Sequence, residues 1–277
     1  MIPQDKAGRE YWNTSWENEP LPGGCGVEFN DLRQYADREL FDWITGWLAR
    51  QGTIGVDKKL VEVGCARSRW LPVFAKQLGI AVHGIDYSPI GCEQARTMLE
   101  REHITGKIYC ADIFAIPNDL VGAFDVVVSF GLIEHFSDSV AIVSALTRLL
   151  KPEGLIFTNI PNMRGIMGLA QKAMNTRIFE IHVPMTPAHV KRAHEKAGVQ
   201  VLQCGYFMSS NFGVLNLGAP DRRDPVWWVK KIILAGLARV SMGIWFLERL
   251  TGMKLPVSMT FSPYVNCVGC RLTGGLE

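Results

Sequence analysis

Short apolar runs alternate with longer amphipathic segments over the first 160 residues of this chain. The runs predict strands near residues 59–64, 80–86, 107–111, 124–130 and 154–160. Between them, apolar positions recur at helical spacing near residues 69–78, 89–102 and 138–150. Runs such as Val126-Val127-Val128 are continuously apolar, which is typical of strands covered on both faces. The alternation predicts an α/β fold with a right-handed, mostly parallel, doubly wound sheet.

The segments on either side of this region extend the prediction. Residues 1–30 are rich in Trp, Pro and Gly and are expected to be irregular, and a helix then runs from an N-cap at Asp31 to a stop at Gly52. After Pro161 the pattern predicts helices at 163–174 and 187–197 and strands at 199–207 and 264–272. A long apolar insertion from about 209 to 262 separates the two strands.

Small and acidic residues at two strand ends carry the first chemical signal. The first strand ends in Glu62-Val63-Gly64-Cys65-Ala66, and the second ends in Asp86-Tyr87 about two dozen residues later. Small residues let backbone amides approach a ligand, and a carboxylate at the second strand's tip can accept from both hydroxyls of a ribose. The pattern predicts a nucleotide-binding half-fold. An ordinary turn and a helix N-cap at Asp86 are the alternatives.

The fourth strand extends this pattern to a family. It ends in Ser129-Phe130-Gly131 and continues with Glu134-His135, and the run Leu149 to Phe157 follows. These motifs resemble the class I S-adenosylmethionine (SAM) methyltransferases that act on small molecules. The resemblance covers about residues 55–160, although the family's acid-x-Gly-x-Gly-x-Gly turn has Ala66 and Ser68 in place of two glycines. It implies SAM as the cofactor and S-adenosylhomocysteine (SAH) as the product. No catechol-type cluster of acids is apparent in the sequence, so we expect no metal.

The resemblance also implies an architecture. The fold would be a Rossmann-like, seven-stranded sheet, with a helical cap formed by the N-terminal segment and the insertion before the last strand. The chain would then divide into four parts: an N-terminal lid and helix (1–54), a SAM-binding core (55–208), an apolar helical insertion (209–262) and a terminal strand of the core (263–277).

Family members hold the cofactor at positions that can be carried over to this chain. The ribose would bind Asp86, and the adenine would lie against Asp112 and Ile113, for which a solvated turn is the alternative at Asp112. Trp16, four residues after Trp12, would belong to a lid over the cofactor, although packing on the sheet edge also explains this pair. The full set of expected cofactor contacts is Glu62, Gly64, Cys65, Ala66, Asp86, Tyr87, Asp112, Ile113, Ser129, Phe130, Trp16 and Trp70.

Histidines supply the candidate catalytic groups. Methyl transfer is an in-line displacement, and a base is needed only when the acceptor must lose a proton. His135, beside Glu134, has a suitable pKa and follows a strand end, although it could instead brace the loop. His182 lies in the connection after the fifth strand and is a second candidate base. His189 and His194 are expected to be surface residues.

These observations predict a SAM-dependent methyltransferase acting on a small, partly apolar acceptor, with oxygen or nitrogen favoured over sulfur or carbon. The run Tyr87 to Cys92 resembles thiol methyltransferases, so S-methylation of a small thiol stays open. A nicotinamide-dependent oxidoreductase would share Gly64 and Asp86 but would leave Asp112 unexplained. The replaced glycines motivate a third alternative, a catalytically silent SAM-binding partner subunit.

Composition and charge limit which partners and which cellular compartment are expected. Lys and Arg total 29 against 27 for Asp and Glu, so no basic field favours nucleic acid as a partner. Seven cysteines, an odd number, suit a reducing compartment. Charged residues including Asp5 and Lys6 precede any apolar run, so we expect no signal peptide and a cytoplasmic protein.

The segment Val226 to Leu250 is broadly apolar for a surface helix. Three explanations compete, favoured in this order: a cap on the acceptor pocket, the face of a homodimer, or a membrane-surface helix with Lys230, Lys231 and Arg239 on its polar side. The charged residues leave no uncharged stretch that approaches the ~20 residues of a bilayer span.

Overall fold

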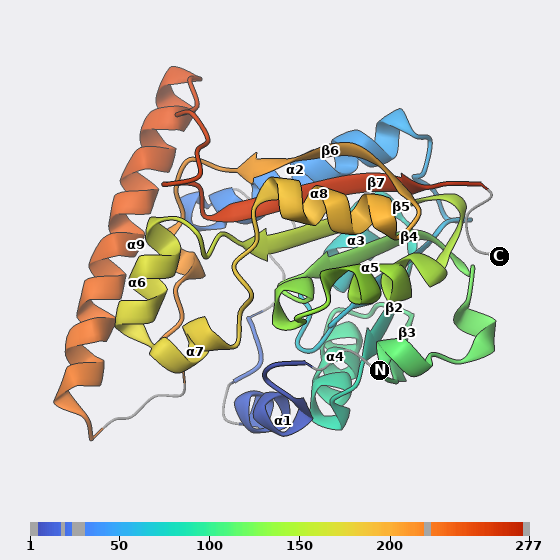
Figure 1. The fold of residues 1–277 in the computed structure, drawn as a ribbon, viewed down its shortest axis with the longest axis horizontal. Helices are drawn as coiled ribbons and strands as arrows, with labels where there is room; N and C mark the ends of the chain where they lie inside the picture. Colours follow the sequence, from blue (N-terminus) through green and yellow to red (C-terminus); the bar gives the residue numbers. More distant parts are fainter. Residues whose placement is uncertain (1–4, 18–19, 24–30, 219–222, 274–277) are drawn as a thin grey trace.

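A single seven-stranded sheet forms the centre of the computed structural model, which describes residues 5–17, 20–23, 31–218 and 223–273 (Figure 1). The strand order is β3-β2-β1-β4-β5-β7-β6. The first five strands are parallel, and β7 pairs antiparallel with both of its neighbours. The predicted doubly wound, mostly parallel sheet is therefore confirmed. The strands are β1 (Lys59–Val63), β2 (Ala81–Asp86), β3 (Gly106–Cys110), β4 (Phe124–Phe130), β5 (Leu150–Pro161), β6 (Val199–Phe207) and β7 (Tyr264–Arg271).

Helices cover both faces of the sheet. On one face the buried apolar cluster includes side chains of α5 and α8, and on the other it includes side chains of α2, α3 and α4. Both clusters take alternate residues of the same strands, so Val127 faces one layer and Val126 and Val128 face the other. The helices are α1 (Arg9–Glu17), α2 (Tyr35–Arg50), α3 (Trp70–Leu78), α4 (Pro89–Arg101), α5 (Ser139–Arg148), α6 (Ile166–Met174), α7 (Thr176–Glu180), α8 (Pro187–Lys196) and α9 (Pro225–Thr251).

The strand order creates the place for a ligand. From β1 the chain winds outward through β2 to β3 and then returns to β4 on the other side of β1. The connections that follow β1 and β4 therefore diverge at the carboxyl ends of these two strands, which is where open α/β sheets bind their ligands.

The structure corrects the prediction at three places. Residues 9–17, predicted to be irregular, form α1, and α7 was not predicted. Strand β5 begins at Leu150 rather than near residue 154, because Leu150 pairs with Phe124 before a register shift. Helix α1 has no buried residue, so no apolar stripe marks it in the sequence.

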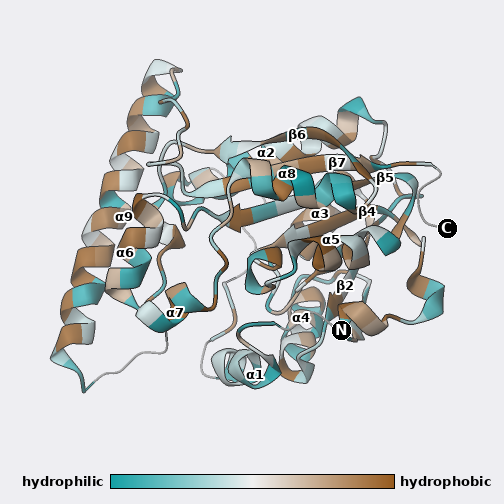
Figure 2. Cartoon of the chain, viewed as in Figure 1, coloured by the Kyte–Doolittle hydropathy of each residue, from teal (hydrophilic) through white to brown (hydrophobic). Residues whose placement is uncertain are grey.

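Helix α9 stands apart at the outer edge of the molecule, next to α6 (Figure 1). It begins at an Asp224 cap and ends at Gly252, whose φ of +69° lies in the left-handed region that favours glycine. Figure 2 shows apolar residues along its length. Among the described residues, no helix is long and apolar enough to cross a membrane.

Candidate active site

A cavity of about 390 Å³ lies at the carboxyl ends of β1, β2 and β4, beneath α1. Its lining includes apolar and aromatic side chains, together with the carboxylates of Asp5, Glu62, Asp86 and Asp112. Of the fifteen residues predicted for the site, eleven line this cavity: Glu62, Gly64, Ala66, Asp86, Tyr87, Asp112, Ile113, Phe130, Trp16, Trp70 and His135.

The turn after β1 forms one wall of the cavity. Gly64 has φ of +80°, and its N–H donates to the Ile85 carbonyl at 2.9 Å. The Ser68 hydroxyl donates to the Glu62 carboxylate and accepts from the N–H groups of Trp70 and Leu71 at 3.0 and 3.2 Å. Ser68 therefore caps the start of α3 and holds Glu62 in place.

Two buried carboxyl groups lie next to each other in this wall. Glu62 is 4% exposed, and burial raises its pKa to about 8. The Asp86 carboxylate accepts from the backbone N–H groups of Ala66 at 3.1 Å and Ser88 at 2.8 Å. Burial raises the pKa of Asp86 against these hydrogen bonds. A ligand that brings a cation or hydroxyl donors would stabilise the charged form of both groups.

The third acid lies beside an apolar slot. Asp112 accepts from the Phe114 N–H at 3.0 Å and so begins a short 3₁₀ turn at Ile113–Ala115. Ile113 is buried, and the rings of Phe114 and Phe136 meet edge to face at 5.7 Å. A flat, apolar group with a hydrogen-bond donor at its edge fits these surroundings.

The N-terminal segment closes the cavity from above. Trp12 and Trp16 stack at 5.5 Å and both line the cavity, although only Trp16 was predicted there. Asp5 accepts from the Trp12 indole N–H at 3.0 Å and from the Tyr87 hydroxyl. The Gln94 side chain donates to the Trp16 carbonyl at 2.8 Å. Asp5 thus fastens the segment to the end of β2, a role that sequence reasoning missed.

His135 lies beneath this segment. Its Nδ1 is 3.1 Å from the Ile181 carbonyl oxygen, and because a carbonyl only accepts, Nδ1 carries the proton. The indole of Trp12 meets the imidazole edge to face at 5.0 Å. Burial lowers the pKa of His135. The ring is therefore neutral, with Nε2 able to accept a proton.

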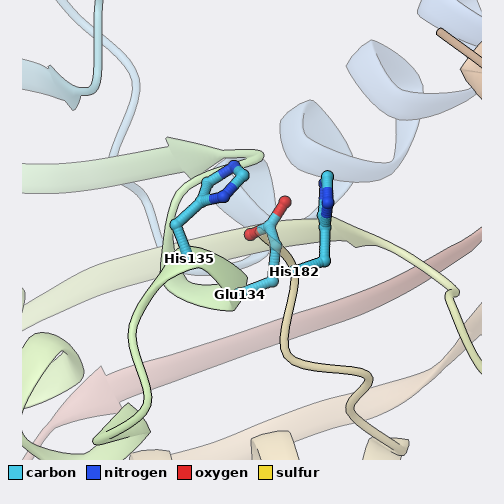
Figure 3. Close-up of side chains that lie close together, drawn as sticks. All are labelled: Glu134, His135 and His182. Carbon is cyan, nitrogen blue, oxygen red and sulfur yellow. The ribbon is translucent and has the colours of Figure 1, made fainter. Parts of the chain in front are cut away.

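Glu134 and His182 lie next to His135 but do not line the cavity (Figure 3). Glu134 is 1% exposed, neither of its carboxylate oxygens has a hydrogen-bond partner among the described residues, and burial raises its pKa to about 8. His182 Nδ1 lies 2.5 Å from the Ile178 carbonyl, and burial together with the neighbouring His135 lowers its pKa to about 4.

The same three residues form a donor set that the sequence did not predict. One ligand atom from each of Glu134, His135 and His182 lies within 4.8 Å of the others. Neutral imidazoles whose second nitrogen donates to a backbone carbonyl, together with a carboxylate, are suited to a divalent metal ion.

Two further predicted contacts do not reach the cavity. Cys65 follows Gly64, but its side chain packs beneath the turn in the apolar cluster, where it meets Gly84 of β2. Ser129 is fully buried in β4, its hydroxyl has no hydrogen-bond partner among the described residues, and it does not line the cavity. Side chains at alternate positions of a strand and turn face opposite ways, so these two residues contribute to the core rather than to the cavity.

A known protein family matches more than half of this chain. The family model described as "Methyltransferase domain" matches residues 32–204. A ubiquinone biosynthesis O-methyltransferase of Colwellia psychrerythraea is 27% identical over 161 residues, 57% of this chain and 61% of that protein. The chain thus spans about three fifths of the length of the curated relatives it matches.

Solved structures share the fold. Magnesium protoporphyrin IX methyltransferase from Synechocystis, solved with bound SAH, is 14% identical with a TM-score of 0.57, covering 97% of this chain and 100% of that one. Geranyl diphosphate C-methyltransferase from Streptomyces coelicolor is 15% identical with a TM-score of 0.54, covering 95% and 96% of the two chains.

Proposed function

Because the chain belongs to the class I SAM-dependent methyltransferase family, we propose that it transfers the SAM methyl group to a small, partly apolar acceptor at an oxygen or nitrogen atom. The cavity beneath α1 carries this proposal, because it combines three acids in the family's positions with an imidazole and an apolar wall. The name of the Colwellia relative, an O-methyltransferase, favours oxygen. Family membership argues against the nicotinamide-dependent alternative.

The cavity's acids suit the polar groups of SAM. Asp86 would accept from the ribose hydroxyls, and Asp112 would accept from the adenine amino group while Ile113 packs against the ring. The Glu62 carboxylate would pair with the ammonium of the methionine end. When bound, SAM supplies a methyl group on a positively charged sulfur that leaves as a neutral thioether.

The part of the cavity around His135 suits the acceptor. Leu132 and Trp12 make this part apolar, and the indole of Trp12 meets the titratable imidazole of His135 edge to face. We propose that His135 Nε2 takes the acceptor's proton as its oxygen or nitrogen attacks the methyl carbon, while the electron pair of the breaking carbon–sulfur bond goes to sulfur. Glu134 and His182, predicted as catalytic, would act by positioning His135 rather than by touching the acceptor.

Calorimetric titration with SAM and SAH tests the cofactor site. We expect both to bind the wild-type protein, and Asp86→Ala to abolish binding because it removes the carboxylate that meets the ribose. Glu93→Ala, at an exposed position of the neighbouring helix α4, is the matched control and should bind like the wild type. If neither ligand binds the wild type, the enzyme assignment fails. If binding is found, labelled SAM then serves to screen acceptors.

A further inference from the structure

One surface of the molecule has no role in the cavity. Of the nineteen large apolar side chains that are exposed in the described part of the chain, fourteen lie between Val226 and Phe261. They occupy α9 and the connection that follows it (Figure 2). No described residue of 209–262 lines the cavity, so in this conformation α9 does not cap it.

The inner face of α9 fixes the helix to the protein. The buried Trp245 donates through its indole N–H to the Ser210 carbonyl at 2.9 Å. Glu248, also buried, accepts from the hydroxyls of Tyr35 at 2.9 Å and Ser209 at 2.7 Å. These polar contacts orient α9, so the side chains on its opposite face are held outward by the structure.

The outer face of α9 is apolar towards both ends of the helix. Its helical spacing places large side chains on the side opposite Trp245, each between 44% and 70% exposed: Trp228, Ile232, Val240, Phe246, Leu247 and Leu250. The 27-residue helix is about 40 Å long, and these side chains follow its length as a strip in two groups, at 228–232 and 240–250, with Gly236 and the exposed Arg239 between them. Monomeric proteins rarely expose such a strip without a binding role.

The exposed charge of the strip is positive. Lys231, Arg239 and Arg249 are exposed on α9, whereas Asp224 caps the helix and Glu248 is buried. Lys231 Nζ lies 5.0 Å from the rings of both Trp227 and Trp228, which groups a cation with aromatic side chains at the edge of the strip. Lys231 and Arg249 flank the apolar strip and Arg239 lies within it. Such cations complement anionic lipid headgroups, and their long stems can reach the phosphates while the apolar side chains insert.

A second copy of the chain fits this strip less well. Two copies of α9 paired antiparallel about a twofold axis would meet near their midpoint, residue 238 of Pro225–Thr251. Arg239 lies beside that point, so each copy would bring its guanidinium against the other's. Juxtaposed like charges disfavour such a pairing.

We propose that α9 docks the protein on an anionic membrane surface, lying in the plane of the headgroups with its apolar face inserted. Helix α9 lies at the same edge of the sheet as the carboxyl ends of the parallel strands, beside α6 (Figure 1). Docking would turn the acceptor side of the protein towards the bilayer, from which a partly apolar acceptor could be drawn. This last step rests on the proposed function, whereas docking itself does not.

Vesicle flotation tests the proposal with the full-length protein. The vesicles contain phosphatidylcholine alone, or phosphatidylcholine with roughly a third phosphatidylglycerol. We expect recovery with the anionic vesicles, and we expect added salt to weaken it. Replacing Ile232, Phe246 and Leu250 together by Ser should lower binding more than tenfold. The control replaces three exposed apolar residues away from α9, Ile54, Val56 and Val121, by Ser and should bind like the wild type.

A second variant separates charge from insertion. Replacing Lys231, Arg239 and Arg249 by Gln should weaken anionic binding about fivefold for each cation and remove the preference over neutral vesicles. Retained SAH binding shows that each variant is folded, and it reports on the proposed function separately. The proposal is overturned if the wild type does not float, or if the serine variant of α9 floats equally well. A serine variant that instead converts a dimer to a monomer assigns the strip to self-association.

Discussion

Replacing the buried Glu62 by Gln should raise the stability of the folded protein at high pH and lower its affinity for SAM. Burial raises the pKa of Glu62 from its ordinary value of 4.5 to about 8. The folded state therefore binds this proton more tightly than the unfolded state, and the resulting stability is lost as pH rises from 4.5 through 8. At about 1.4 kcal/mol for each pH unit, the loss sums to about 5 kcal/mol.

Glutamine has nearly the same shape and no charge to bury. Below a pH of about 4.5, Glu62 is neutral in both states, and the variant should match the wild type in stability. Above a pH of about 8 the variant should be more stable by up to about 5 kcal/mol, since only the wild type buries a carboxylate. Urea unfolding at several pH values measures this difference.

Bound SAM should reverse the preference of the folded protein for the neutral form of Glu62. An ammonium held against Glu62 would favour its charged form, so SAM binding at about neutral pH should release a proton. Calorimetry in two buffers of different ionisation enthalpy detects this release. The glutamine variant should bind SAM more weakly and release no proton.

Glu134→Gln is the matched control. Glu134 is equally buried, and burial also raises its pKa to about 8, but it does not line the cavity. We expect the same gain in stability at high pH, with SAM affinity and proton release unchanged. If the two variants bind SAM equally, or if Glu62→Gln keeps the wild-type proton release, Glu62 does not meet the ammonium.

Three further predictions concern the remaining parts of the site. His135→Gln should keep its SAH affinity but lower single-turnover methyl transfer by about 10²–10⁴-fold, and an unchanged rate would leave His135 as a brace for the loop. The donor atoms of Glu134, His135 and His182 lie within 4.8 Å of one another, so added Zn²⁺ should bind there, occupy the proposed base and inhibit methyl transfer, and EDTA should restore the activity. If EDTA alone abolishes methyl transfer, a bound metal ion is instead required for the reaction. Asp5→Asn should weaken the hydrogen bonds from Trp12 and Tyr87 to this side chain, each worth about 1 kcal/mol, and so loosen the N-terminal segment over the cavity. Stopped-flow measurements should then show SAH dissociating at least tenfold faster, whereas an unchanged rate would mean that other contacts hold α1.

The sequence predicted the sheet well because buried parallel strands leave an unambiguous pattern. Val126, Val127 and Val128 are fully buried, as their continuous apolar run indicated. The prediction was wrong where local pattern and structure diverge. Helix α1 is held by contacts with distant parts of the chain rather than by a buried stripe, and no periodicity records such contacts.

The cavity was predictable at the strand ends and not elsewhere. Asp86 is the last residue of β2 and Asp112 follows β3, and the carboxyl ends of these strands meet at one edge, so topology alone brings the two acids together. Asp5 accepts a hydrogen bond from Tyr87, 82 residues away in the sequence, and the residues around Asp5 give no pattern that predicts this contact. His194, expected at the surface, is fully buried and pairs with Thr158 at 3.0 Å. It shares the inward face of α8 with Val190, four residues earlier, so helical spacing could have revealed its burial.

The glycine turn shows why a departure from a family pattern need not mean a lost site. Gly64 is the residue of the pattern whose backbone lies in the left-handed region, and it is the glycine that this chain keeps. Neither Ala66 nor Ser68 has a positive φ, so neither position needs a glycine for its backbone. Ala66 still donates its N–H to Asp86, and the Ser68 hydroxyl caps α3 and holds Glu62. The replacements therefore keep the turn's shape and stabilise the carboxyl groups of the proposed cofactor site, which removes the structural motive for a silent subunit.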